Sequence, residues 1–135
     1  MTPILGHDVS VAMWVSERVG QNFAPPFTAI GFGNRGGIAA GAVFNDYVPY
    51  GNIELTLAAD RPFTRSMLRT LAAYVFGQLG CSRLTVRTRQ DNENVCNMAK
   101  RFGFVREATL KDYYGTDQNA ELFRLLRKDV KGWLH

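Results

Sequence analysis

The sequence predicts one α/β domain over residues 1–135, with a central mixed β-sheet of about six to seven strands flanked by helices. The length suits one domain and is short for two. Hydrophobic residues make up 46% of the chain, so a sizeable core can form. The predicted elements run in the order helix, hairpin, strand, helix, strand, helix, strand, strand. The central strand–helix–strand pieces imply parallel pairing through right-handed crossovers, whereas the flanking pairs are expected to be antiparallel.

The first third of the chain is predicted to form a helix and then a β-hairpin. Apolar residues recur at helical spacing between Asp8, a good N-cap, and Gly20, a good stop. Glycine and Asn34 supply a turn between two short apolar runs. The predicted segments are a helix over 8–19, a loop over 21–27, strands over 28–32 and 38–44, and a turn over 34–37.

The rest of the chain alternates strands and helices. Ile53, Leu55 and Leu57 share one face of the third strand, which places Glu54 on the opposite face. A long apolar stripe predicts the next helix, which Gly80 ends. The predicted segments are strands over 52–58, 83–88, 104–113 and 120–127, and helices over 64–79 and from Asn92 to Gly103.

The composition argues against several classes of protein. The chain has no run of about 18 apolar residues and no signal-peptide pattern at its start, so a cytoplasmic protein without a membrane span is expected. Cys81 and Cys96 are expected to be reduced, partly buried thiols. With His7 and His135 they give no metal-ligand spacing, so no metal site is predicted. Catalysis is therefore expected to use carboxylates, hydroxyls, tyrosines and backbone amides.

The net charge of +4 suits an anionic partner. Basic residues are spread along the chain without a dense run, whereas a nucleic-acid footprint usually clusters. A ligand that carries several phosphates would satisfy the charge equally well.

The junction between the third strand and the long helix is a candidate phosphate site. A helix N-terminus presents free backbone N–H groups and a positive dipole end. Arg61 and Arg65 could add charge-assisted hydrogen bonds, and Thr64 and Ser66 could add hydroxyl donors. An ordinary capped helix would show the same local pattern.

The run NENVCNMAKRFGF at 92–104 combines a helix cap, an apolar stripe and a glycine stop before an aromatic strand start. A well-capped amphipathic helix explains these features by itself. The run also resembles the segment of the GNAT acetyltransferases that begins with Asn and ends in Gly-Phe. The following VREATL resembles the ribosomal-protein acetyltransferase branch of that family. The junction at 61–66 aligns with the family's pyrophosphate loop, and the order of elements agrees over roughly 28–127.

The resemblance implies that the chain binds acetyl-CoA and transfers the acetyl group to a primary amine of a protein or small molecule. Backbone groups near Leu57 and Ala58 would hold the pantetheine arm between two splayed strands. The loop residues Arg61, Phe63, Thr64, Arg65 and Ser66 would bind the pyrophosphate, and Asn92 could reach the pantetheine. Glu54 would be the general base, with a solvated strand carboxylate as the alternative. Tyr113 or Tyr114 could supply the acid, and Tyr114 is the predicted one, with ordinary surface aromatics as the alternative for both.

The sequence departs from the family's pattern at the proposed site. Thr64 and Ser66 stand where glycines are usual, and Pro62 removes one backbone donor. Val95 stands where a small residue is usual. Ala99 stands where many members have the tyrosine that protonates the leaving thiolate, so that role is not assigned from the motif.

Two other functions stay open on the sequence alone. The departures would suit a CoA-binding protein of the same fold with weak catalysis. The charge would suit a small basic nucleic-acid-binding domain, which would need a contiguous basic face with aromatic platforms. The acceptor is not identified, and a homodimer is one option for the oligomeric state.

Overall fold

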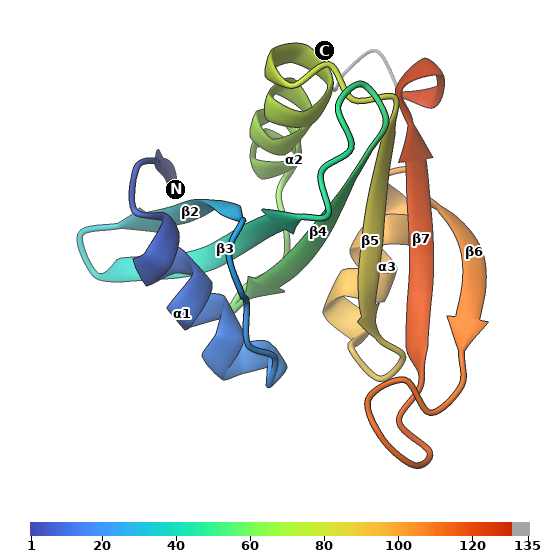
Figure 1. Ribbon diagram of the computed structural model, residues 1–135. Coiled ribbons are helices and arrows are strands. Elements are labelled where there is room, and N and C mark those ends of the chain that lie inside the picture. Colours follow the sequence, from blue (N-terminus) through green and yellow to red (C-terminus); the bar gives the residue numbers. More distant parts are fainter. Residues whose placement is uncertain (131–135) are drawn as a thin grey trace.

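The structure, a computed structural model, describes residues 1–130 and contains a seven-stranded mixed sheet with helices on both faces (Figure 1). Residues 131–135, which the predicted domain includes, lie outside the described residues. The elements in chain order are β1 (Thr2–Ile4), α1 (Asp8–Val19), β2 (Thr28–Asn34), β3 (Gly37–Asn45), β4 (Asn52–Ala59), α2 (Arg65–Ala72), the π-helix η1 (Ala73–Gln78), β5 (Arg83–Arg89), α3 (Glu93–Arg101), β6 (Val105–Leu110), β7 (Ala120–Leu126) and the 3₁₀-helix η2 (Arg127–Asp129).

The sheet has the strand order β1-β2-β3-β4-β5-β7-β6. Within the described chain, β4 and β5 form the parallel pair and the other neighbours are antiparallel. The predicted hairpin, the parallel centre and the antiparallel flanks are therefore confirmed. The expected parallel pairing of the strands before and after α3 is wrong, because β7 inserts between them. Seven residue pairs, from Arg83↔Leu126 to Arg89↔Ala120, join β7 to β5 and exclude β6 from that edge.

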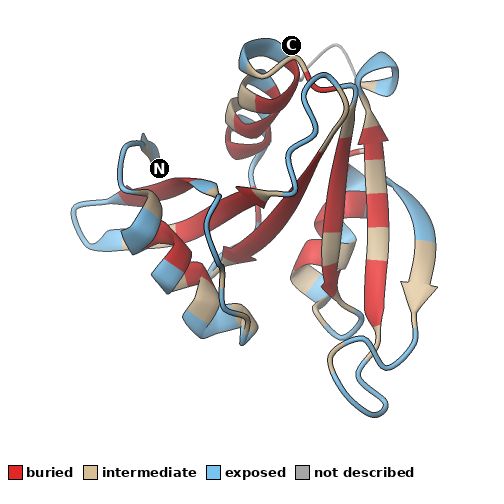
Figure 2. Cartoon of the chain, viewed as in Figure 1, coloured by how far each residue is buried: buried red, intermediate tan, exposed pale blue. Residues whose placement is uncertain are grey.

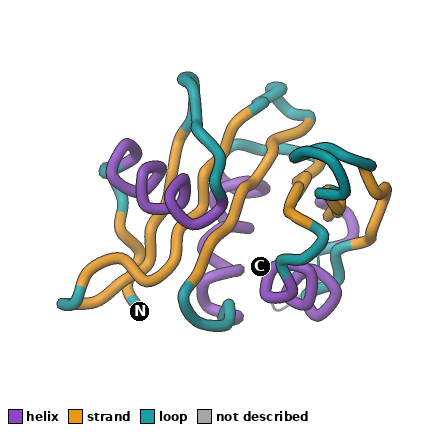
Figure 3. Tube along the Cα trace, turned by 90° about the horizontal axis from the view of Figure 1, so that it is seen from below, coloured by secondary structure: helices purple, strands orange, loops and turns teal. Residues whose placement is uncertain are grey.

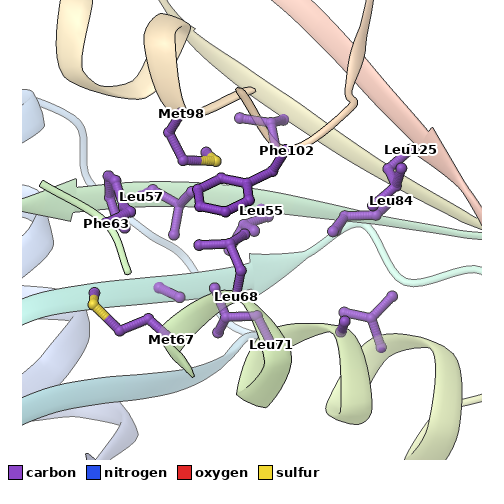
Figure 4. Close-up of a cluster of buried hydrophobic side chains, with 14 of the residues drawn as sticks. Leu55, Leu57, Phe63, Met67, Leu68, Leu71, Leu84, Met98, Phe102 and Leu125 are labelled. Carbon is purple, nitrogen blue, oxygen red and sulfur yellow. The ribbon is translucent and has the colours of Figure 1, made fainter. Parts of the chain in front are cut away.

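Two hydrophobic clusters lie on opposite faces of the sheet. The larger one packs α2, η1 and α3 against the sheet, with Leu55 and Leu57 at its centre (Figure 4). The smaller one packs Val11, Ala12 and Val15 of α1 against β2, β3 and β4. Helix α1 therefore covers one face, and α2 and α3 cover the other (Figure 3). Strands β3 and β4 are buried along most of their length, whereas β6 is half-exposed at the sheet's edge (Figure 2).

Helix α1 has the predicted bounds but not the predicted cap. Its N-cap is His7, which makes no side-chain capping bond, and Gly20 ends the helix with a φ of 69°. Asp8 lies in the first turn, where the helix dipole favours a carboxylate. Its Oδ1 accepts a hydrogen bond from the backbone N–H of Ala29 at 3.2 Å, so it joins the helix to β2. The Asp8 carboxylate, which was expected to cap the helix, bonds to β2 instead.

The predicted helix over 64–79 is divided into α2 and η1. Thr64 is its N-cap and Gly80 follows its end with a φ of 66°, as expected. The last turns are π-helical, with the N–H of Leu79 bonded to the carbonyl of Tyr74 at 2.9 Å. Tyr74 contacts the sheet twice, through a 2.8 Å hydroxyl–hydroxyl bond to Thr28 and through the ring of Phe44. The wider turn changes the direction in which the following side chains leave the helix.

Strand β1 was not expected from the sequence. It has three residues, one of them Pro3, so no alternating pattern could reveal it. It pairs antiparallel with β2 at the sheet's edge. Cys81 is buried and Cys96 is half-buried, and both are free thiols, as predicted. Within residues 1–130 no helix is long and apolar enough to cross a bilayer, and no group of three His, Cys, Asp or Glu residues is placed to hold a metal ion.

Gly41 allows α1 to pack closely on β3, so Gly41→Ala should destabilise the fold by about 1–3 kcal/mol. A Cβ at this position would lie 2.6 Å from Cγ2 of Val15 and 3.2 Å from Cγ1 of Val11. Valine side chains are stiff about χ1 and cannot turn aside cheaply. Urea unfolding at constant m-value measures the change.

Gly77→Ala is the matched control, because a Cβ at Gly77 meets nothing within 4 Å. Its free energy of unfolding should be unchanged or rise by up to about 1 kcal/mol. Equal stability of the two variants would contradict close packing at Gly41.

Candidate active site

Strands β4 and β5 pair for only part of their length. Their parallel register runs from Asn52↔Arg83 to Leu55↔Val86. Beyond these pairs β4 continues against β3, β5 continues against β7, and the two strands diverge (Figure 1). Along 56–59 and 87–89, one backbone edge of each strand therefore faces the gap, with N–H and C=O groups available to a ligand.

A cavity of about 290 Å³ lies in this gap. Its walls come from the end of α1, the two diverging strands, the start of α3 and the β6–β7 loop. Four of the predicted site residues line it: Leu57, Ala58, Asn92 and Tyr114. The divergence of the strands thus opens a cavity beside the backbone of Leu57 and Ala58.

Glu54 lies beside this cavity on the face that α1 covers. It is 5% exposed, so the alternative of a solvated strand carboxylate is wrong. Its Oε1 lies 3.1 Å from a guanidinium nitrogen of Arg87, which itself lines the cavity. Its side chain is also hydrogen-bonded to that of Asp46, at the start of the β3–β4 loop.

These neighbours set the protonation of Glu54. Burial is the largest influence and, together with the Asp46 carboxyl, it raises the pKa of Glu54 from the usual 4.5 to about 7. The positive charge of Arg87 opposes this rise. A carboxyl group with this pKa can gain and lose a proton near neutral pH, which is the property a general base requires.

Tyr114 enters the cavity wall from the β6–β7 loop. Its ring lies edge-on to that of Tyr113, with centroids 4.8 Å apart. The guanidiniums of Arg87 and Arg89 lie over the rings of Tyr113 and Tyr114, at 4.6 and 5.2 Å from the centroids. Burial raises the pKa of the Tyr114 phenol, and the charge of Arg87 opposes that rise. A phenol is protonated at neutral pH even at its usual pKa of about 10, so Tyr114 has a proton to donate.

Buried polar groups hold the two loops of the site together. Oε1 of Glu121, a side chain 4% exposed, accepts hydrogen bonds from Gln90 at 2.8 Å and Thr109 at 2.9 Å. Gln90 Oε1 accepts a bond from the side-chain amide of Asn119 at 3.2 Å. Asn119 Oδ1 in turn accepts one from the backbone N–H of Asp112 at 3.0 Å. The network links the β5–α3 loop, which precedes Asn92, to the loop that carries Tyr114.

The helix start after β4 lies outside the lining of the cavity. Thr64 Oγ1 accepts a hydrogen bond from the N–H of Met67 at 3.2 Å and so caps α2. Arg61, Arg65 and Ser66 are exposed around it. Phe63 is buried in the larger cluster, so only its backbone is left to meet a ligand (Figure 4).

Asn92 caps α3 as the sequence predicted. Its Oδ1 accepts a hydrogen bond from the N–H of Val95 at 3.3 Å, and the same residue lines the cavity. Gly103 follows the end of the helix with a φ of 89°. Ala99 is fully buried in the larger cluster.

Sequence reasoning missed the two partners of Glu54. Arg87 had a signal, because the alternation of Leu84, Val86 and Thr88 places it on the other face of its strand. No sequence pattern indicated Asp46, because its position depends on the conformation of a loop in which it adopts a φ of 53°.

No family model and no curated protein sequence matches the chain. Several solved structures are similar to the chain. A probable acetyltransferase has a TM-score of 0.66 at 17% identity, covering 76% of this chain and 62% of its own. Ribosomal-protein-S5-alanine acetyltransferase from Vibrio fischeri has a TM-score of 0.66 at 13% identity, covering 91% and 70%. A variant of spermidine N-acetyltransferase from Vibrio cholerae has a TM-score of 0.72 at 11% identity, covering 93% and 95%.

The chain spans less than two thirds of the length of the first of these structures. The shared feature is the fold, which is that of the GNAT acetyltransferases. The expectation of fold drawn from the run at 92–104 is therefore confirmed.

The raised pKa of Glu54 predicts how its variants respond to pH. A folded pKa of about 7, above the usual 4.5, means that the folded state binds more protons between these values, so stability falls as pH rises through this window. Glu54→Gln removes the buried charge. Its melting temperature relative to the unmodified chain should therefore be higher at pH 8 than at pH 5, measured by calorimetry.

Glu107→Gln is the control with the opposite sign. Arg83 and Arg124 hold the pKa of the Glu107 carboxyl below its usual value, so its favourable charge is lost only as pH falls below about 4.5. This variant should lose a constant amount of stability between pH 5 and 8. A similar constant difference for Glu54→Gln would show that the Glu54 pKa is not raised.

Proposed function

We propose that this chain, which has the fold of the GNAT acetyltransferases, transfers an acetyl group from acetyl-CoA to a primary amine. The observation that carries the proposal is Glu54. It is a buried carboxylate with a pKa of about 7, beside a cavity formed where two parallel strands diverge. A base of this kind suits a reaction in which an amine must lose a proton.

The cavity and the helix start after β4 are the proposed binding site for acetyl-CoA. The free backbone edges at Leu57 and Ala58 would bond the pantetheine arm, and a backbone N–H there would polarise the thioester carbonyl. Exposed N–H groups in the first turn of α2, together with Arg61, Arg65 and the hydroxyls of Thr64 and Ser66, would hold the pyrophosphate. The backbone of Phe63 would also contact the pyrophosphate, and the side-chain amide of Asn92 would bond the pantetheine arm.

Acetyl-CoA supplies an activated acyl group whose carbon accepts the amine nitrogen while the C–S bond breaks. Glu54 would take the proton that the amine loses, directly or through a water. Arg87 stabilises the ionised form of Glu54, whereas Asp46 and burial favour the protonated form. This balance keeps both forms accessible near neutral pH.

Tyr114 is the proposed acid for the leaving thiolate. Position 99 holds a buried alanine and offers no hydroxyl. Tyr114 lines the cavity, and its phenol carries a proton at neutral pH. We therefore propose that Tyr114 protonates the leaving thiolate, since α3 has no tyrosine at position 99.

The two alternative functions have less support. The basic side chains along β5 and β7 are engaged with carboxylates, which leaves a weak attraction for nucleic acid. The pairs are Arg83 and Arg124 with Glu107, Arg87 with Glu54, and Arg89 with Asp91. A catalytically weak CoA-binding protein would not need a base poised near pH 7. We propose a cytoplasmic setting and a reaction without a metal ion.

Calorimetry with acetyl-CoA tests the binding site. The chain should bind acetyl-CoA, and Ser66→Glu should weaken the affinity at least about tenfold, which corresponds to about 1.4 kcal/mol. The reason is that Ser66 is exposed in the first turn of α2, where the added carboxylate would repel pyrophosphate.

Gln78→Glu adds the same charge at the exposed end of η1, which continues α2, and should leave the affinity unchanged. If the folded chain shows no binding at millimolar acetyl-CoA, the proposed function is wrong. If both variants bind equally well, the phosphates lie elsewhere.

Steady-state kinetics test the base. Glu54→Gln keeps the shape of the side chain and should lower the acetylation rate at pH 7 by roughly 10²- to 10⁴-fold, with little change in acetyl-CoA affinity. For the unmodified chain, kcat/KM should rise with pH through about 7, as Glu54 ionises. The variant should lose this step and recover part of its rate at high pH, where the amine is already neutral.

Glu107→Gln, which changes a carboxylate on the outer strand β6, should retain the pH profile and the rate. Full activity of Glu54→Gln across the pH range would remove Glu54 from the mechanism.

A further inference from the structure

Arg87 lies at the point where β4 and β5 separate. Glu54 is directly opposite Thr85 in the parallel register, and Arg87, two residues farther along β5, shares their face of the sheet. The last parallel pair is Leu55↔Val86, so Arg87 is the first residue of β5 beyond that pairing. Its side chain can therefore reach β4 on one side and the β6–β7 loop on the other.

The guanidinium of Arg87 has partners on both sides of the cavity. One of its nitrogens lies 3.1 Å from Oε1 of Glu54. Its central carbon lies 4.6 Å from the centre of the Tyr113 ring, and its N–H groups donate a hydrogen bond to the phenol of Tyr114. Arg87 therefore contacts the proposed base and the proposed acid at the same time.

Burial makes this shared cation effective. The side chain of Arg87 is 21% exposed and that of Glu54 is 6% exposed, and charges interact more strongly where water is largely excluded. Burial raises the pKa of Glu54 and the pKa of Tyr114, and the positive charge of Arg87 opposes both rises. One guanidinium therefore stabilises the ionised form of either group.

The other charged and titratable groups of the site come from each element around it. They are Asp46 of the loop after β3, Arg18 of α1 with its partner Asp60, Arg89 of β5 with its partner Asp91, and Tyr113 of the β6–β7 loop. Among the described residues, Arg87 is the group whose charge acts on both Glu54 and Tyr114. A link between base and acid must therefore pass through Arg87.

We propose that Arg87 is a positioning residue that links the base to the acid, so that one guanidinium stabilises Glu54 before acetyl transfer and Tyr114 after it. This inference rests on the proposed function. At the start, Glu54 is a carboxylate and Tyr114 is a phenol. The amine nitrogen bonds to the acetyl carbon and gives its proton to Glu54. The C–S bond breaks, and the sulfur takes the phenol proton of Tyr114.

The reaction moves the negative charge from one partner of Arg87 to the other. The amide and the free thiol of CoA leave a protonated Glu54 and a Tyr114 phenolate, so the net charge of the site is unchanged. A half-buried phenolate without a bonded cation would be unfavourable, and Arg87 supplies that cation. The site is restored when Glu54 returns its proton to Tyr114, directly or through a water.

Titration of the ligand-free protein tests the link. Carbon NMR of isotope-labelled glutamate and tyrosine, assigned with Glu54→Gln and Tyr114→Phe, follows both groups. Arg87→Met should raise both pKa values by about one unit or more, because it removes the cation that they share. An unchanged pKa at either group in Arg87→Met would overturn the proposal.

Glu54→Gln gives a second measurement, which stands even if Arg87→Met does not fold. It should lower the pKa of Tyr114, because it removes a nearby negative charge and leaves the guanidinium to the phenolate. In the Arg87→Met background the same substitution should have a smaller effect. An unchanged Tyr114 pKa in Glu54→Gln would show that the two groups are not linked.

Two further variants separate the link from general effects. Arg83→Met is the matched control, because Arg83 lies on the same strand and is paired with the carboxylate of Glu107 outside the cavity. It should leave both pKa values unchanged. Arg87→Lys keeps the charge but not the planar fork that reaches two partners. It should leave the pKa of Glu54 within about half a unit and raise that of Tyr114. Values equal to those of the unmodified chain at both groups would show that no bridging guanidinium is needed.

Kinetics test the consequence for catalysis. Release of the CoA thiol would be measured with the best acceptor among spermidine, phenethylamine and a peptide that begins with alanine. Arg87→Met should lower kcat and move both limits of the kcat/KM profile to higher pH, since Glu54 ionises later and Tyr114 keeps its proton longer. Arg83→Met should leave both limits in place. Weaker acetyl-CoA binding by Arg87→Met with unchanged limits would show instead that Arg87 binds a ligand.

The outcomes separate this inference from the proposed function. If acetyl-CoA binds and is turned over, but the pKa values of Glu54 and Tyr114 do not respond to Arg87→Met, the inference alone fails. If no acetyl transfer occurs, the proposed function fails, and the titrations of the ligand-free protein still decide whether Arg87 links the two groups.

Discussion

The divergence of β4 from β5 is the constraint on which the rest of the site depends. After the pair Leu55↔Val86, each strand stays paired with its outer neighbour, β3 or β7, and the two cannot rejoin. Backbone groups that a continuous sheet would consume therefore face a cavity. The divergence is compatible with a stable fold because helices cover both sides of β4, and Leu57 remains buried in the larger cluster. The sheet loses some strand pairing at its centre and gains a place for a ligand.

The same geometry explains why a carboxylate can be buried on β4. Glu54 precedes the last parallel pair, on the face that α1 covers farther along the strand. Arg87 reaches it from β5, and Asp46 reaches it from the loop after β3. A buried charge is costly without a partner, and a full ion pair would fix it as ionised. One cation and one further carboxyl leave Glu54 between these extremes, which is why its pKa lies near 7.

Glu121 shows how polar groups away from the cavity support the site. It is the other buried glutamate, yet it holds loops together rather than facing the cavity. Through Gln90 and Asn119 it connects the start of α3 to the loop of Tyr114. Both loops contribute to the cavity wall, so their relative position depends on interactions between residues far apart in the chain. Sequence motifs cannot reveal such a network, because its residues are far apart in the chain and share no local pattern.

The sequence by itself determined most elements and their order, since hydrophobic periodicity, glycine stops and the Asn92 cap are local signals. It also placed Glu54 on the face opposite Leu55, because alternation along a strand is a property of the backbone. It could not show β1, the π-helical end of the long helix, or β7 between β5 and β6, since each depends on a partner elsewhere. The tertiary structure alone decided that Glu54 is buried between Arg87 and Asp46, and that Asn45 Oδ1 meets no hydrogen-bond donor within residues 1–130. These properties arise from register and loop closure, and both are set by contacts between segments that no local pattern encodes.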